Sequence, residues 1–127
     1  RLPNINAALG CAQLEQLEEI LKAKRKLFER YKVAFSNISE VKMVSEPAGC
    51  KSNYWLQTVL LDESVSSERD TLLDATNDAG LMTRPVWTLM CRLLPYQKCP
   101  KMKLSVAESL EKRLINLPSS AHRGEVE

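Results

Sequence analysis

The sequence is poor in the residues that most catalytic and metal sites require. Its 127 residues include one histidine, His122, and four glycines. Neither a glycine-rich phosphate loop nor a nucleophile elbow is present, and the histidine stands in a polar segment. The four cysteines form no CxxC pair, the spacing typical of zinc and redox sites. On its residues alone, we predict that the chain contains no catalytic, cofactor-binding or metal-ligating residue.

Long apolar runs and a strong excess of one charge are also absent. No stretch approaches the roughly 18 apolar residues that span a bilayer, and no charged-then-apolar leader is present. The 18 Lys and Arg residues nearly balance the 16 Asp and Glu residues, which leaves a net charge of +2. That balance does not indicate nucleic acid or an anionic membrane as a partner. We therefore expect a soluble, cytoplasmic protein.

The four cysteines are expected to be reduced and mostly buried. A chain of this length does not depend on disulfide staples, and free cysteine commonly packs as a small apolar residue. A disulfide or a metal role is the alternative. The positions are Cys11, Cys50, Cys91 and Cys99.

What the sequence does contain is a strong helical pattern at its N-terminal end. Apolar residues recur every three or four positions through residues 3–35, which is the period of one helical face. We expect one long helix there, about 45 to 50 Å in length at 1.5 Å per residue. Because that exceeds the width of so small a domain, residues 21–35 should pack in the chain's own core. Residues 5–12, rich in alanine and with Gly10, should fit a surface that the chain lacks.

The rest of the chain alternates between strand and helix patterns. Residues 41–44 and 53–61 read as strands, the second in the middle of a sheet. Ser67 and Asp70 resemble a capping box for a helix that ends at Gly80, and Ser105 with Glu108 resembles a second one. Residues 81–86 suit a further strand with Pro85 at its end or edge, and residues 87–96 an irregular segment or short helical turn. The helix from Ser105 should continue through Leu114 and stop at Pro118.

These elements predict an α+β fold, a small and mostly antiparallel sheet packed with helices and preceded by one long N-terminal helix. We expect a single domain over residues 1–120, including the long helix over residues 3–35, and a polar tail over residues 121–127.

Two groups of residues suggest ligand binding. Arg84, Pro85 and Trp87 place a forked, permanently charged donor beside a rigid turn and a large aromatic ring, a combination that suits anionic or ring-shaped ligands. The alternative is a surface arginine next to a core tryptophan. A loose basic loop could meet phosphates or could simply be solvated; it contains Arg92, Lys98, Lys101 and Lys103.

Four segments together resemble the DegT and StrS type aminotransferases, fold type I enzymes that use pyridoxal phosphate to aminate nucleotide-linked keto sugars. The segments are RLPNINAALG at residues 1–10, NYW at 53–55, TRP at 83–85 with Trp87, and LINLPSS at 114–120. The combination of RPVWTLM with INLPSS is most similar to the branch that acts on UDP-linked 4-keto-6-deoxy-N-acetyl sugars.

The resemblance implies that the chain is the small C-terminal domain of such an enzyme, joined by its long helix to a large cofactor domain within a homodimer. In the family the lysine that binds pyridoxal phosphate lies upstream, so the chain alone should bind no cofactor and be inactive, and the parent enzyme should hold the pyridoxal phosphate. Arg1, Arg84 and Trp87 are then the expected contacts to the nucleotide sugar. Cys91 stands where many relatives carry histidine or asparagine. A free-standing, non-catalytic module that self-associates through residues 5–12 is the alternative.

Overall fold

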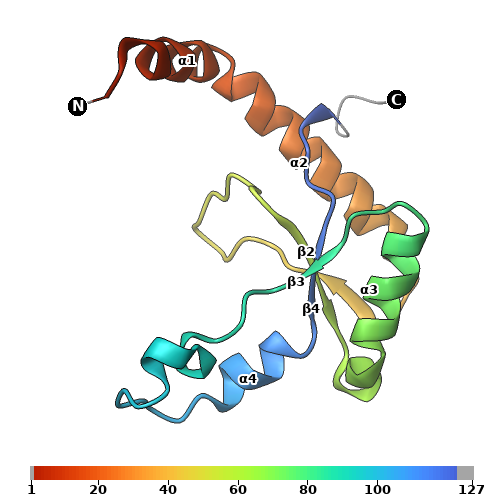
Figure 1. The fold of residues 1–127 in the computed structure, drawn as a ribbon. Coiled ribbons are helices and arrows are strands. Elements are labelled where there is room, and N and C mark those ends of the chain that lie inside the picture. Colours follow the sequence, from red (N-terminus) through yellow and green to blue (C-terminus); the bar gives the residue numbers. More distant parts are fainter. Residues whose placement is uncertain (1, 123–127) are drawn as a thin grey trace.

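The computed structural model describes residues 2–122 and has the predicted α+β fold (Figure 1). Three short 3-10 helices, η1 (Glu63–Glu68), η2 (Met90–Arg92) and η3 (Leu94–Tyr96), link its regular elements. None of the described helices is long and apolar enough to cross a membrane. The helices are α1 (Asn4–Glu15), α2 (Leu17–Ala34), α3 (Arg69–Asp78) and α4 (Ser105–Glu111), and the strands are β1 (Val41–Met43), β2 (Gln57–Leu61), β3 (Arg84–Pro85) and β4 (Leu114–Leu117).

The strands form one antiparallel sheet in the order β1-β2-β4-β3. Val59 in β2 pairs with Met43 in β1 on one side and with Ile115 in β4 on the other. The predicted strand at residues 41–44 and the interior position of residues 57–61 are thus confirmed. Pro85 pairs at the sheet edge, as its missing backbone donor requires.

Strand β4 is a correction, because we expected residues 114–117 to continue the helix from Ser105. The helix ends at Glu111, and Leu114–Leu117 pairs with both β2 and β3. A four-residue apolar run suits either structure. Pairing buries Ile115, which is 5% exposed, and satisfies the backbone on both sides. Pro118 therefore follows a strand instead of ending a helix.

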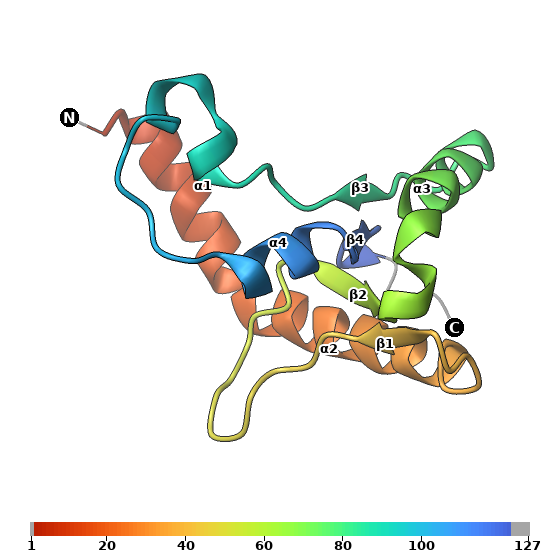
Figure 2. The ribbon, with the colours of Figure 1, turned by 90° about the horizontal axis from the view of Figure 1, so that it is seen from below.

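The core lies between α2 and one face of the sheet, as Figure 2 shows. Burial alternates along β2, with Gln57, Val59 and Leu61 turned inward, because successive side chains of a strand point to opposite faces. Phe28 of α2 packs in the same cluster. Leu73 of α3 adds a partly buried contact. Both helices therefore serve the face that carries Val59.

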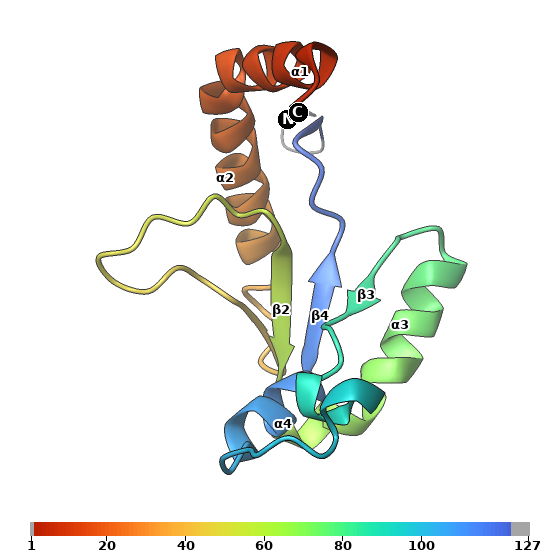
Figure 3. The same ribbon diagram turned by 60° about the vertical axis from the view of Figure 1, so that its left-hand side comes forward.

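The expected single helix over residues 3–35 is wrong, because the chain breaks at Gln16, which has φ −99° and ψ 0°. No proline or glycine stands at this point to signal the break. The apolar stripe changes direction instead: at about 100° per residue, Leu17 and Leu21 lie roughly 120° around the helix from Ile5 and Leu9. One straight helix could not turn both stripes to the same side, and Figure 3 shows α1 turned away from the axis of α2.

Helix α1 does not pack in the core of the domain. None of its side chains is buried, and those of Ile5 and Leu9 are 77% and 63% exposed. A Cβ atom added at Gly10 would meet nothing within 4 Å. In α2, by contrast, Ala23, Leu27 and Phe28 are buried. The predicted packing of residues 21–35 in the core is confirmed, and none of residues 5–12 is buried.

Helix starts and cysteine burial require further corrections. Ser67 lies inside η1, whose start is capped by the Asp62 carboxylate accepting from the Ser64 backbone N–H at 3.0 Å. Helix α4 begins after Leu104 without a side-chain cap. Gly80 does end α3, at a φ of +78° that suits glycine. The four cysteines are free, as predicted, but three are exposed and Cys91 is half-buried, because they lie outside the core.

Candidate functional site

The sheet face opposite α2 carries a row of polar groups. Thr58, Asn116 and Arg84 are register partners across β2, β4 and β3, so they share the face that Val59 and Ile115 do not. The Thr58 hydroxyl donates to Asn116 Oδ1 at 2.8 Å, and Asn116 Nδ2 donates to the Pro85 carbonyl at 3.4 Å. These bonds fix the Asn116 amide and leave Arg84 exposed at the end of the row.

Both tryptophans of the chain meet at the surface. Trp87 is 71% exposed and stacks on Trp55, which is 63% exposed, with ring centroids 6.1 Å apart and planes at 28°. Trp87 is therefore not a core residue, which removes the alternative left open by the sequence. Two adjacent exposed indoles are unusual for a surface without a partner, because each carries a large apolar area. We call Trp55 and Trp87 the tryptophan pair.

Trp55 lies in a tight turn, whereas we expected a strand over residues 53–61; the strand begins only at Gln57. Ser52 Oγ accepts from the Tyr54 N–H at 3.0 Å, and Asn53 Oδ1 accepts from the Trp55 N–H at 3.0 Å. Tyr54 has a φ of +46°, in the left-handed region. Serine and asparagine side chains favour such turns by bonding to the backbone two residues on. The Ser52-Asn53 dipeptide was thus the signal for a turn, and sequence reasoning missed it.

Arg25 and Glu46 hold this turn against α2 through hydrogen bonds. Arg25 of α2 donates two hydrogen bonds to the Glu46 carboxylate, at 2.9 and 3.0 Å, and one to the Ser52 carbonyl at 2.8 Å. The Arg25 guanidinium, with the Ser52 N–H, lowers the pKa of Glu46 to about 2. Arg25 also lies 5.2 Å from the centre of the Tyr54 ring, which stacks on Phe28 at 4.4 Å. The turn is therefore fixed to α2 by charge as well as by packing.

Lys24 joins the same turn to the segment after β4. Its ammonium group donates to the carbonyls of Ser119 at 2.6 Å, Trp55 at 3.1 Å and Tyr54 at 3.4 Å. Partial burial lowers its pKa. Gln57 completes the junction, since its backbone N–H donates to Ser119 Oγ at 2.7 Å and its side chain donates to the Lys24 carbonyl at 3.0 Å. The NYW and LPSS segments, distant in sequence, thus meet at one lysine.

The structure describes two of the three sequence-predicted substrate contacts, Arg84 and Trp87. Arg1 lies outside the described residues. Arg84 and Trp87 are both exposed, but the arginine that lies over an aromatic ring is Arg25. In the basic loop, Arg92 pairs with the buried Glu111 at 2.6 Å and is therefore committed to the fold. The loop's lysines at positions 98, 101 and 103 are exposed.

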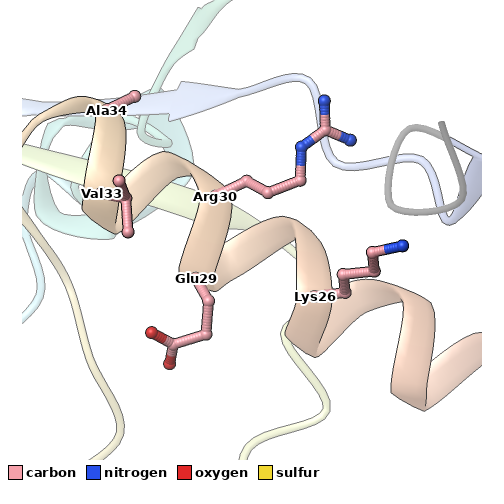
Figure 4. Close-up of a pocket in the computed structure, with 5 residues that line it drawn as sticks. All are labelled: Lys26, Glu29, Arg30, Val33 and Ala34. Atoms are coloured by element: carbon pink, nitrogen blue, oxygen red, sulfur yellow. The ribbon is translucent and has the colours of Figure 1, made fainter. Parts of the chain in front are cut away.

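Neither tryptophan lines either of two hollows of the described surface. One of about 380 Å³ lies in the segment that joins β3 to α4 and is lined by Leu89, Tyr96 and Leu104 among others. Another, of about 600 Å³, lies against α2 alone (Figure 4). Its lining side chains point in different directions from one helix, so they do not enclose a ligand; they are Lys26, Glu29, Arg30, Val33 and Ala34.

A metal or a pyridoxal cofactor does not fit the described residues by themselves. No group of three or more His, Cys, Asp or Glu side chains that could hold a metal occurs among residues 2–122. Pyridoxal phosphate requires a lysine amine beside a ring-binding pocket. Lys24, the lysine with a lowered pKa, gives its donors to three backbone carbonyls instead. No chemical step is therefore assigned to that cofactor on this chain.

Comparison with known proteins gives a consistent family. The model of the DegT/DnrJ/EryC1/StrS aminotransferase family matches residues 1–125. GDP-perosamine synthase of Vibrio cholerae is 32% identical over 120 residues, which cover 94% of this chain and 32% of that protein. The aminotransferase TlmJ of Streptoalloteichus hindustanus has a TM-score of 0.82 at 25% identity, over 93% of this chain and 31% of that one. DesI, solved in the presence of its TDP-sugar product, has a TM-score of 0.84 at 23% identity, over 92% and 30%.

The chain thus spans about a third of the length of the relatives that it matches. The likeness of the folds agrees with the family match, which covers nearly every residue. The chain belongs to the DegT/DnrJ/EryC1/StrS aminotransferase family.

Proposed function

We propose that this chain is the C-terminal portion of a pyridoxal phosphate-dependent aminotransferase that aminates a nucleotide-linked keto sugar. The observation that carries the proposal is the exposed tryptophan pair, with Arg84 also exposed three residues before Trp87, in a chain that belongs to the DegT/DnrJ/EryC1/StrS aminotransferase family. The chain supplies the nucleotide-sugar side of the active site, and a large domain outside this sequence supplies the cofactor. The parent enzyme acts as a cytoplasmic homodimer.

The chemistry of these residues suits such a substrate. A guanidinium keeps its charge at any physiological pH and can form paired hydrogen bonds to a diphosphate, a role that we assign to Arg84 and Arg1. The Trp87 ring offers an apolar surface to a sugar or base ring. Asn116, held by Thr58 and the Pro85 carbonyl, is oriented by the protein before any ligand arrives.

The cofactor supplies the amino-transfer chemistry, for which its ring acts as an electron sink. The residues of this chain would bind and orient the substrate and help to exclude water. By itself the chain should therefore not transaminate. Incubation with pyridoxal phosphate, borohydride reduction and mass spectrometry test this point, and a phosphopyridoxyl lysine in this chain would contradict it.

The test of the main proposal uses the full-length parent enzyme with a 4-keto-6-deoxy sugar and glutamate as amino donor. Arg84→Met and Trp87→Leu should each raise the KM for the nucleotide sugar about 10- to 100-fold, which corresponds to about 1.4 to 2.8 kcal/mol of lost binding. Lys112→Met, an exposed lysine to which no binding role is assigned, is the control and should leave the KM unchanged. Wild-type KM values in both substitutions would refute the role of this surface. UDP- and GDP-linked substrates, compared in parallel, identify the nucleotide.

A free-standing module that self-associates through α1 is the second candidate, favoured by the exposure of Ile5 and Leu9. Sedimentation of the 127-residue chain separates the two. Concentration-dependent dimers that Leu9→Glu abolishes would support the module. A monomer at high concentration would contradict it.

A further inference from the structure

We propose that Lys24 is a positioning residue for the tryptophan pair: its ammonium group holds the turn at residues 53–56 in the shape that stacks Trp55 on Trp87. The role as a positioner of a binding surface rests on the proposed function of that surface. The contacts from which it is inferred do not, because they belong to the fold.

The acceptors of Lys24 are unusual for a lysine on a helix. An ammonium group has three donors and no acceptor. Here the three bonds go to three backbone carbonyls, from Tyr54 and Trp55 in the turn and from Ser119 after β4. None of these acceptors is a carboxylate, so the contact is not an ion pair whose partner could be exchanged for another charge. It fixes the directions of three specific peptide groups.

The backbone of Trp55 is held at both ends by this arrangement. Its N–H donates to Asn53 Oδ1 at 3.0 Å, and its carbonyl accepts from Lys24 at 3.1 Å. Asn53 lies within the turn and can move with it, whereas Lys24 belongs to α2. The link to the helix therefore fixes the turn relative to the rest of the domain. The Trp55 ring, 63% exposed, has little packing of its own to do this.

The turn has a further need for such a link, because Tyr54 adopts a φ of +46°. Bulky residues rarely occupy the left-handed region, and they do so where the surrounding structure holds them there. The Tyr54 carbonyl accepts from Lys24 at 3.4 Å while the ring stacks on Phe28. The next carbonyl, that of Trp55, faces the same donor. Two consecutive carbonyls that converge on one ammonium define a turn and exclude an extended strand.

Lys24 is itself held in place. Gln57, only 1% exposed, donates from its side chain to the Lys24 carbonyl at 3.0 Å. The Gln57 N–H also donates to Ser119 Oγ, and Ser119 supplies the shortest of the three carbonyl contacts to Lys24. The lysine thus stands in a closed set of bonds between α2, β2 and the segment after β4. A lysine side chain held in this way can fix the position of the Trp55 backbone relative to α2.

The experiment exploits the fact that the 127-residue chain contains two tryptophans and that they stack on each other. Stacked indoles give an exciton couplet in circular dichroism, which Trp87→Phe should abolish. Lys24→Met should reduce the couplet amplitude by more than half. Lys22→Met, an exposed lysine on the same helix, is the matched control and should keep the full amplitude.

A second variant distinguishes positioning of the tryptophan pair by Lys24 from a general contribution of α2 to stability. Leu27→Ala removes a buried side chain from the same helix and should lower the melting temperature, yet keep the couplet below that temperature. Full amplitude in Lys24→Met, or an equal loss in Leu27→Ala, would overturn the proposal. If Lys24→Met does not fold, Lys24→Gln decides: its shorter amide reaches fewer of the carbonyls, so an intermediate amplitude supports the proposal and full amplitude refutes it.

The couplet is recorded without substrate, so its outcome is independent of the proposed function. If Trp87 variants of the parent enzyme bind nucleotide sugar normally while Lys24→Met loses the couplet, Lys24 positions the pair but the pair is not the substrate surface. If the couplet survives and the KM of Trp87 variants rises, the surface is correct and the role of Lys24 is wrong.

Discussion

Because the helix breaks at Gln16, we predict that the same substitution will destabilise the protein much more after the break than before it. Leu27 in α2 is 4% exposed, and Leu9 in α1 is 63% exposed. Leu27→Ala and Leu9→Ala remove identical atoms from two helices that the sequence pattern read as one. Comparison of the two variants therefore tests where the core of this domain ends.

The magnitudes follow from burial. Truncation of a buried leucine to alanine costs about 2 to 5 kcal/mol, the transfer term plus the cavity that remains. A mostly exposed leucine has little of its roughly 1.5 to 3 kcal/mol of burial energy to lose. Alanine's better helix propensity offsets part of that small loss. We expect at least 2 kcal/mol for Leu27→Ala and less than about 0.5 kcal/mol for Leu9→Ala.

Urea unfolding of the 127-residue chain, followed by tryptophan fluorescence and far-ultraviolet circular dichroism, measures both changes. Equal destabilisation by the two substitutions would show that α1 shares the core and that the break is not a structural boundary. A change below about 1 kcal/mol for Leu27→Ala would refute the packing of α2 on the sheet. Leu27→Met, nearly equal in volume, serves as the control and should cost less than about 1.5 kcal/mol.

Three further predictions concern other parts of the fold. The pKa of Glu46 is lowered from 4.5 to about 2 in the folded state, so its contribution to stability is complete above pH 4.5 and is lost as the pH falls toward 2. Glu46→Gln should therefore reduce the loss of stability at acid pH in a curve of unfolding free energy against pH. An unchanged acid limb would contradict the pairing with Arg25. In denaturant unfolding, Ile115→Ala should lower the free energy of unfolding by about 2 to 5 kcal/mol. Val106 on α4 is 71% exposed, so Val106→Ala should lower it by less than about 0.5 kcal/mol. Equally small effects of both substitutions would exclude β4 from the core. Ellman's reagent should titrate three thiols quickly and Cys91 more slowly, with no gain on prior reduction; fewer than four thiols would reveal a disulfide.

Much of the fold was predictable because its signals are local. The 3.6-residue pattern of α2, the glycine that ends α3 and the proline at the sheet edge each act within a few residues. The elements that were misread depend on what lies elsewhere. Residues 114–117 became a strand because β2 and β3 accept them, and a sequence window does not contain those partners.

The candidate site shows the same limit. Arg84 and Trp87 drew attention through their own neighbours, and both are exposed as a binding role requires. Their companion Trp55 was assigned to a strand, because aromatic content outweighed the turn-forming Ser52 and Asn53 that precede it. Lys24 gave no signal at all. Its contacts depend on the carbonyls of Tyr54 and Ser119, which lie 30 and 95 positions later in the sequence.

Two segments of the domain carry large apolar side chains that are mostly exposed. Helix α1 bears Ile5 and Leu9, and the segment between β3 and α4 bears Leu94 at 85% and Met102 at 87% exposure (Figures 1 and 2). Exposed apolar clusters of this kind mark surfaces that a partner covers, and relatives three times as long have the chain to do so. The large domain that we propose for the parent enzyme is the partner that we expect to cover both segments.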